Sequence, residues 1–355
     1  MRKNWPRWIG YATAIWSLSY ALLGLYWTFG GGGFPFGSGD PQMAREGANA
    51  IHANVLGLAT PEIAGPIIAG VGLFAAVVAA LMAAGKGTGG GSVLLLSSAW
   101  TMVVVLGIVI QDYRPLTLVA YLPIFAIGKI FFGWPEGVGL EALVGWPILN
   151  LASCLIAAVA FAMTAVAYRR RVRDACGDCG RSDGDDGRGL VRWGRPAVIV
   201  AITVPLIYCT TRWLWALGFS LGIDPQWYAE GQENGLWLAG AALATLGLGG
   251  AILTLGLIQR WGEVFPRWMI GLRGRRVPPM LAVIPALAVA VLVTAAGTMY
   301  IRMAFTMGVE GTWVTNMPET LWPLWGAGLA VAALAYHQRR RGPCVICGRG
   351  TPTAA

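Results

Sequence analysis

The sequence has few charged side chains and almost no histidine. Of its 355 residues, 12% are Asp, Glu, Lys or Arg, whereas 56% are hydrophobic. A soluble domain carries about 25% charged residues. This chain therefore has too little charge to cover a water-facing surface, which excludes an ordinary soluble protein. Much of its surface is expected to face lipid.

Two further absences limit the metal sites and catalytic reactions that the chain can support. His52 and His337 are the only histidines, which argues against a histidine metal site within the membrane and against a His–Asp acid–base pair in each half. No phosphate-binding P-loop, nucleophile elbow or H-E-x-x-H motif occurs. An intramembrane enzyme that modifies lipid is therefore the least favoured function, and no catalytic residue is predicted.

Long apolar segments are what the chain has instead. A membrane helix needs about 20 apolar residues. Eight segments meet this requirement: 8–30, 63–84, 92–111, 146–168, 196–222, 236–258, 281–302 and 320–337. A ninth apolar segment, 116–133, follows the third span closely and contains Pro123 and Lys129.

The distribution of basic residues gives the topology. Most of the 26 Lys and Arg residues lie in 1–7, 85–91, 169–195, 259–279 and 338–355. Basic loops stay on the cytoplasmic side, so we expect a bacterial plasma membrane protein with both termini in the cytoplasm. The same rule accounts for the net charge of +9 without nucleic-acid binding. If segment 116–133 crossed the membrane, the basic loops of one half would lie outside. We therefore expect it to be a re-entrant or interfacial helix.

The two halves of the chain resemble each other. The first span and its flanks match the fifth at an offset of 188, as in Trp27 and Trp215. DPQMAREG after the first span matches DPQWYAEG after the fifth, and YRRRVRDACGDCGR (168–181) matches YHQRRRGPCVICGR (336–349). Four spans per copy give both copies the same orientation. The predicted fold is an all-α integral membrane protein with eight transmembrane helices in two parallel four-helix repeats, 1–181 and 196–355, joined by a linker, 182–195.

Each repeat ends in a Cys-x-x-Cys motif followed by Gly-Arg. The four cysteines are Cys176, Cys179, Cys344 and Cys347. Structural zinc takes a closed tetrahedral set of four ligands, and two such turns supply four thiolates. We therefore expect one shared zinc ion below the membrane. A redox role, another metal, or thiols without a function are the alternatives.

Several charged residues lie within or beside the predicted spans. Arg212 lies inside the fifth span, where the first repeat has Gly24. A charge at such depth usually faces the helix-bundle interior or a water-filled cavity. A set of residues at the outer side extends this pattern: Arg114, Arg302, Asp112, Asp40, Glu46, Asp224 and Glu230. Together they indicate an outward-facing cavity that binds a small polar or anionic solute, or else a solvated interface of helix caps.

Short motifs resemble two groups of bacterial proteins. Leu25-Tyr26-Trp27 with Gly30-Gly31 resembles small four-span membrane proteins of unknown function. RWGEVFPRWMIGLRGRRVPP (260–279) and the final CVICGRG resemble tandem-repeat membrane proteins of actinobacteria. The resemblance implies an eight-helix fold and implies no activity.

Three functions are therefore compatible with the sequence. The first is transport or permeation of a small solute, and the second is a sensor or accessory subunit whose cytoplasmic zinc knuckle docks a protein partner. The third is the lipid-modifying enzyme.

Overall fold

The computed structural model describes residues 5–87, 89–132, 144–182, 189–267, 269–307 and 313–350. Within these ranges the regular structure is helical, and the backbone bridge between Val264 and Arg276 is isolated. The chain forms two compact units. Unit 1 contains the described residues of 1–185 and 343–355, and unit 2 contains those of 186–342. The cysteine motif at the end of the chain thus belongs to the same unit as Cys176.

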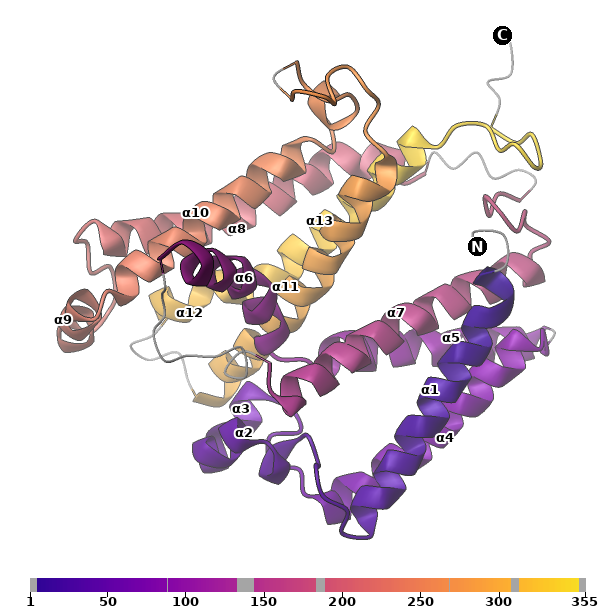
Figure 1. Ribbon diagram of the computed structural model, residues 1–355, viewed down its shortest axis with the longest axis horizontal. Coiled ribbons are helices and arrows are strands. Elements are labelled where there is room, and N and C mark those ends of the chain that lie inside the picture. The colour runs from indigo at the N-terminus through magenta and orange to yellow at the C-terminus, as the bar shows by residue number, and fades with distance from the viewer. Residues whose placement is uncertain are drawn as a thin grey trace. The chain divides into compact units, whose positions relative to one another are not determined.

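Unit 1 is built on four long helices (Figure 1): α1 (Trp5–Thr28), α4 (Pro61–Ala83), α5 (Gly90–Val104) and α7 (Trp146–Val172). Helix α1 packs on α4 and α7, and α5 packs on α7. Glycine permits the closest of these contacts: a Cβ atom on Gly24 would lie 2.6 Å from the backbone nitrogen of Ala69. Small residues allow membrane helices to approach in this way. Phe161 and Tyr168 of α7 fill the core between α4 and α5.

Shorter elements connect these helices. After α1 come the 3₁₀ turn η1 (Gly37–Gly39), α2 (Pro41–Glu46), the 3₁₀ turn η2 (Gly47–Asn49) and α3 (Ala50–Ala53). Helix α5 continues into a π-helical turn, η3 (Val105–Val109), and is followed by α6 (Arg114–Ile127) and a second π-helical turn, η4 (Gly128–Phe132).

Unit 2 also has four long helices: α8 (Gly194–Ala216), α10 (Leu236–Leu255), α11 (Pro279–Met307) and α13 (Trp322–Arg340). Helix α8 packs on α10 and α13, and α11 packs on α13. Its shorter elements are η6 (Val191–Trp193), α9 (Pro225–Glu233), η7 (Arg260–Gly262) and α12 (Trp313–Thr320). Leu329 and Tyr336 of α13 lie in the core that these helices enclose.

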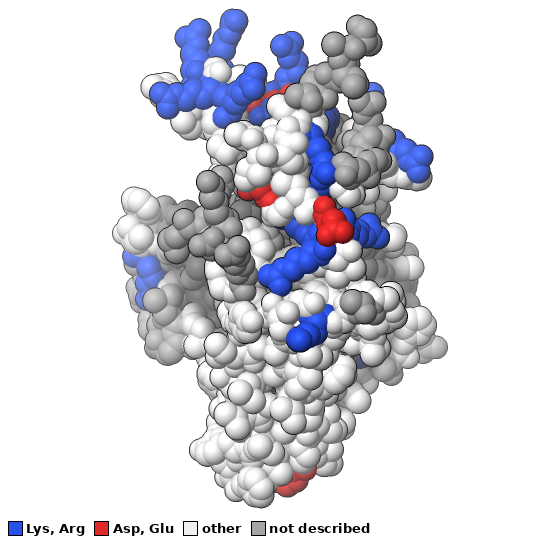
Figure 2. Space-filling view, turned by 90° about the vertical axis from the view of Figure 1, so that its right-hand side faces the viewer, with Lys and Arg blue, Asp and Glu red and all other residues white. Residues whose placement is uncertain are grey.

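Seven helical segments among the described residues are long and apolar enough to cross a membrane: Trp8–Thr28, Pro61–Ala83, Gly90–Val109, Trp146–Val172, Val191–Ala216, Leu236–Leu255 and Pro279–Phe305. Large apolar side chains such as Ile15, Ile156 and Leu253 are exposed on them. Figure 2 shows that uncharged residues form most of the face in view. Lipid is the solvent that such a surface requires, so the chain is a polytopic membrane protein.

The structure changes some details of the predicted spans. The predicted span 196–222 extends too far, since α8 ends at Ala216 and Gly218 has a φ of 106°, which no helix contains. Segment 320–337 does form a helix, α13, but its ends are aromatic and polar, and it is not among the seven apolar segments. Segment 116–133 forms most of α6 and η4, which expose Val119, Ile130 and Phe131. Most of the predicted linker, 183–188, lies outside the described residues.

Candidate metal centre

The first cysteine motif forms a tight turn beyond the end of α7. The amide of Gly180 donates to the carbonyl oxygen of Cys176 at 2.7 Å, and the amide of Cys176 donates to that of Arg181 at 3.0 Å. Gly180 has a φ of 73°, in the left-handed region that favours glycine. The guanidinium group of Arg170, on the last turn of α7, donates to the carbonyl oxygen of Gly177 at 3.0 Å. The helix end therefore supports the turn.

The second cysteine motif repeats this backbone geometry. The amide of Gly348 donates to the carbonyl oxygen of Cys344 at 2.8 Å, and the amide of Cys344 donates to that of Arg349 at 3.0 Å. Gly348 has a φ of 69°. We call the two turns knuckle 1 (Cys176–Arg181) and knuckle 2 (Cys344–Arg349).

The knuckles bring their four thiols together. The Sγ atoms of Cys176, Cys179, Cys344 and Cys347 all lie within 4.8 Å of one another. Equivalent cysteines face each other, with Sγ–Sγ distances of 4.0 Å for Cys176 and Cys344 and 3.6 Å for Cys179 and Cys347. All four are free cysteines. The gathering of the four predicted residues is confirmed.

The spacing of the sulfur atoms fits a tetrahedral metal ion. With metal–sulfur bonds of about 2.3 Å, the edge of a zinc–thiolate tetrahedron is about 3.8 Å, and the two facing pairs measure 4.0 and 3.6 Å. The amide of Arg181 points at the sulfur of Cys179 with an N–S distance of 3.4 Å. A donor of this kind stabilises negative charge on a ligating sulfur. The site thus offers four thiol ligands in an arrangement compatible with a metal ion.

The local backbone also prepares thiolates. A hydrogen bond from the backbone of Cys179 is the main cause that lowers the pKa of Cys176 to about 6. The corresponding bond from the backbone of Cys347 lowers the pKa of Cys344. Burial acts in the opposite direction on Cys179 and raises its pKa to about 11. The first cysteine of each knuckle therefore has a lowered pKa, and the thiolate is the form that binds metal.

Arg114 lies in a closed cluster of buried ions in unit 1. Its guanidinium group contacts Asp40 at 2.5 Å and Asp112 at 2.7 Å, and all three residues are at least 94% buried. The side-chain amide of Asn54 also donates to Asp112, at 2.9 Å. These bonds join the segment after α1 to the start of α6. Three residues predicted to bind a solute therefore bind one another.

Arg212 has an acidic partner that the sequence did not reveal. Its guanidinium group forms an ion pair with Glu319 of α12, and its carbon atom Cζ lies 4.6 Å from the ring centre of Tyr208 and 4.2 Å from that of Trp215. Both members of the ion pair belong to unit 2. Glu319 lies in the short helix α12, directly before the predicted span 320–337.

Two of the remaining predicted solute-binding residues, Asp224 and Glu230, make local contacts in α9. Asp224 caps the start of α9 by accepting from the amides of Gln226 and Trp227, and Glu230 accepts from the side chain of Gln226 at 3.5 Å. Glu46 is exposed at the end of α2, and Arg302 is half-buried on α11. The helix-cap interpretation of the Asp-Pro-Gln motifs therefore describes Asp224, and Asp40 caps α2 in the same way.

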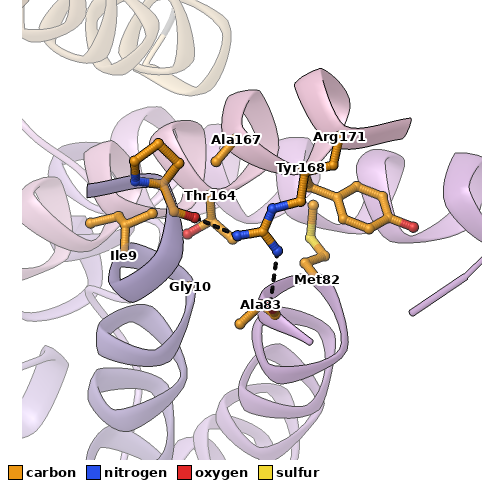
Figure 3. A pocket seen from close by; sticks show the side chains of 9 residues that line it. Ile9, Gly10, Met82, Ala83, Thr164, Ala167, Tyr168 and Arg171 are labelled. Carbon is orange, nitrogen blue, oxygen red and sulfur yellow. Dashed lines mark hydrogen bonds between the residues drawn. The ribbon is translucent and has the colours of Figure 1, made fainter. Parts of the chain in front are cut away.

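A shallow hollow in unit 1 is filled by an arginine (Figure 3). The guanidinium group of Arg171 donates to the carbonyl oxygen of Pro6 at 2.7 Å and to that of Ala83 at 2.9 Å. It thus joins the beginning of α1 to the end of α4. Because cations are favourable at helix C-termini, we interpret this arginine as a structural clamp.

Comparison with known proteins gives no relative. The chain matches no protein-family model, no curated protein and no solved structure. The assignment of function therefore depends on the geometry of the chain itself.

Proposed function

We propose that this polytopic membrane protein is an accessory or sensor subunit whose cytoplasmic knuckles bind one structural zinc ion and present a docking surface for a protein partner. The observation that carries the proposal is the meeting of four thiols from two knuckles that are far apart in the sequence. Tetrahedral sulfur sites suit zinc or iron. Zinc is favoured because the site is closed and has no open position for chemistry.

The tip of knuckle 2 is suited to docking. Val345 and Ile346 are 101% and 63% exposed, although both are apolar, and a metal-bound turn would hold them rigidly. The matching positions of knuckle 1 are Gly177 and Asp178, so only one knuckle carries an apolar tip. Arginines surround the cysteines in both motifs. The partner that fits is a protein with an apolar pocket and an acidic rim.

Elemental analysis of the purified full chain tests the metal. We expect about one zinc per chain, and about none in a Cys176→Ser/Cys344→Ser variant. Iron in place of zinc would show another metal in the same ligand set, whereas two ions per chain or none would contradict a shared structural site.

A matched pair of variants tests the docking surface. Val345→Ser/Ile346→Ser should keep its zinc but lose the partner that co-purifies from native membranes with the wild-type chain. Gly177→Ser is the control at the matching position of knuckle 1, where a Cβ atom meets nothing within 4 Å, and it should keep both. Equal partner recovery with all three proteins would contradict docking through knuckle 2.

The proposal includes a tandem repeat with both termini in the cytoplasm. Contacts made by equivalent residues, at an offset of 168, support the repeat. Tyr168 donates to the carbonyl oxygen of Lys86 at 2.7 Å, in the turn after α4, and Tyr336 donates to that of Gly262 at 2.6 Å, in the loop after α10. Arg339 of α13 donates to the carbonyl oxygen of Leu257 as Arg171 of α7 does to that of Ala83. The second helix of each half is thus held at its end by the fourth.

Transport of a small polar or anionic solute is the second candidate, and the Arg212–Glu319 pair favours it. Oε2 of Glu319 and Nε1 of Trp322 are buried and have no hydrogen-bond partner among the described residues. Buried polar groups without a partner are rare, and functional sites are one place where they occur. If the pair serves transport, Arg212→Met/Glu319→Gln should fold, bind zinc and abolish the cellular phenotype of the chain. An unchanged phenotype would contradict transport.

A further inference from the structure

The connection between α10 and α11 is longer than its counterpart after α4. Only six residues, 84–89, separate α4 from α5, whereas residues 256–278 separate α10 from α11. Part of this connection forms a hairpin, residues 263–277. The amide of Phe265 donates to the carbonyl oxygen of Arg275 at 3.0 Å, and the amide of Val277 donates to that of Glu263 at 2.9 Å. Trp268 lies outside the described residues.

The base of the hairpin is fixed to the end of α13. Arg339 forms an ion pair with Glu263 at 3.0 Å, and Arg340 donates to the carbonyl oxygen of Val277 at 2.9 Å. Glu263 is the only acidic residue in 256–278, and these arginines of α13 already neutralise it. The base of the hairpin is therefore held against α13, and the one acid of the hairpin already has partners on that helix.

The far part of the hairpin combines positive charge with exposed apolar side chains. Arg267, Arg273 and Arg275 are exposed and form no ion pair with any described acidic residue. Ile270, between them, is 98% exposed, and Leu272 is also exposed. Because backbone hydrogen bonds close the hairpin and Arg340 holds its base, these side chains form one surface.

The partner that fits this surface is an anionic membrane. The chain enters the connection from α10 and leaves it through α11, both of which are long and apolar enough to span the bilayer. The hairpin starts eight residues after Leu255 and ends two residues before Pro279, so it stays close to the headgroups. We propose that the hairpin binds anionic lipid headgroups through its arginines while Ile270 and Leu272 enter the boundary between headgroups and acyl chains. Basic segments beside a membrane helix act in this way.

Hydrogen–deuterium exchange of the full chain in lipid nanodiscs tests the inference. One set of nanodiscs contains phosphatidylcholine alone, and the other contains phosphatidylcholine with phosphatidylglycerol. We expect the backbone amides of 267–275 to exchange about fivefold more slowly in the anionic nanodiscs, the size that one arginine–lipid contact gives. High salt should remove most of this difference because it screens exposed charges.

Matched variants test whether the arginines of the hairpin, rather than the positive charge of the chain as a whole, bind the anionic lipid. Arg273→Gln/Arg275→Gln should remove the difference between the two lipids. Ile270→Asn should reduce protection in both. Arg192→Gln/Arg195→Gln removes two exposed arginines elsewhere in unit 2 and should leave the hairpin unchanged. Equal exchange in both lipids, or protection by a soluble acidic protein and not by anionic lipid, would overturn the inference.

Discussion

Arg181 and Arg349 bind each other's backbone. Nη1 of Arg181 donates to the carbonyl oxygen of Arg349 at 2.6 Å, and Nη1 of Arg349 donates to that of Arg181 at 2.7 Å. The two bonds are reciprocal, and each joins one knuckle to the other. The carbonyl oxygen that each arginine binds also accepts from the first cysteine of its own knuckle. Each guanidinium group therefore positions the opposite knuckle.

The first prediction concerns these arginines as positioning residues for the metal. Arg181→Ala and Arg349→Ala should each keep about one metal ion per chain but release it about 10- to 100-fold faster to a chelator, the usual effect of losing an outer contact of a metal site. Arg173→Ala is the control, since Arg173 is exposed near knuckle 1. Each single variant removes one donor only, because the carbonyl oxygen of the substituted residue still accepts from the other arginine, so the double variant should release the ion faster than either single variant. A release rate equal to that of the control would refute the positioning role.

The second prediction concerns removal of the metal. A metal ion bound by the four thiols would join Cys179 to Cys344 and so close a loop of more than a hundred residues. In the chain-entropy treatment such a crosslink stabilises the folded state by about 5 kcal/mol. Chelation should therefore lower the thermal stability of the chain and expose residues 343–350 to protease.

A cysteine variant controls for the chelator in that experiment. Cys344→Ser/Cys347→Ser should be protease-sensitive at the same segment without chelation. Cys154→Ala, at a buried cysteine inside α7, should respond to chelation as the wild type does. A tail that stays resistant in the metal-free chain would mean that the knuckles pair without metal.

The third prediction concerns the two buried tyrosines. Tyr168 and Tyr336 are each 1% exposed and donate their hydroxyl groups to a loop carbonyl oxygen. Phenylalanine at either position leaves that carbonyl oxygen without its donor, so each variant should lose about 1–2 kcal/mol of unfolding free energy. If the two units are repeats, the losses should be similar. Denaturation of each variant in detergent measures them, and a large loss at one position alone would argue against equivalent roles.

The cysteine cluster could be predicted because its determinants are local. A Cys-x-x-Cys-Gly turn sets its own backbone geometry, with Gly180 and Gly348 in the left-handed region. Each turn supplies two thiolates, so a metal ion that takes four ligands requires the two turns to meet. The meeting of the four cysteines is confirmed, whereas the bound zinc ion stays a prediction. The arginine that follows each motif was visible in the sequence, but nothing local indicates that it binds the opposite turn.

The ion pairs were harder to predict because their partners are distant in the chain. Arg212 was marked by its depth in a span, yet Glu319 is more than a hundred residues away. The first predicted repeat has Gly24 where the second has Arg212, and the two positions pack differently. Gly24 lets α1 touch α4, whereas the Arg212 side chain lies beside Gly240 of α10, 3.7 Å from the position of a Cβ there. The length of the apolar segments predicted most of the long helices, but the end of α8 depended on Gly218.

The last prediction distinguishes a structural Arg114 from a solute-binding one. Arg114 is the cation between two buried carboxylates, Asp40 and Asp112, and its loss would leave both without compensation. Removing one member of a buried ion pair typically costs about 3–5 kcal/mol. Arg114→Met should therefore be strongly destabilised, with a lower denaturation midpoint in detergent.

Neutralising the carboxylates together with the arginine separates the two roles. Arg114→Met/Asp40→Asn/Asp112→Asn has no buried charge at this site, so it should recover most of the stability that Arg114→Met loses. Its cellular phenotype should be that of the wild type, because a structural cluster serves only to hold the segment after α1 against α6. A triple variant that is stable but has lost the phenotype would contradict a purely structural role and would support solute binding by these three residues.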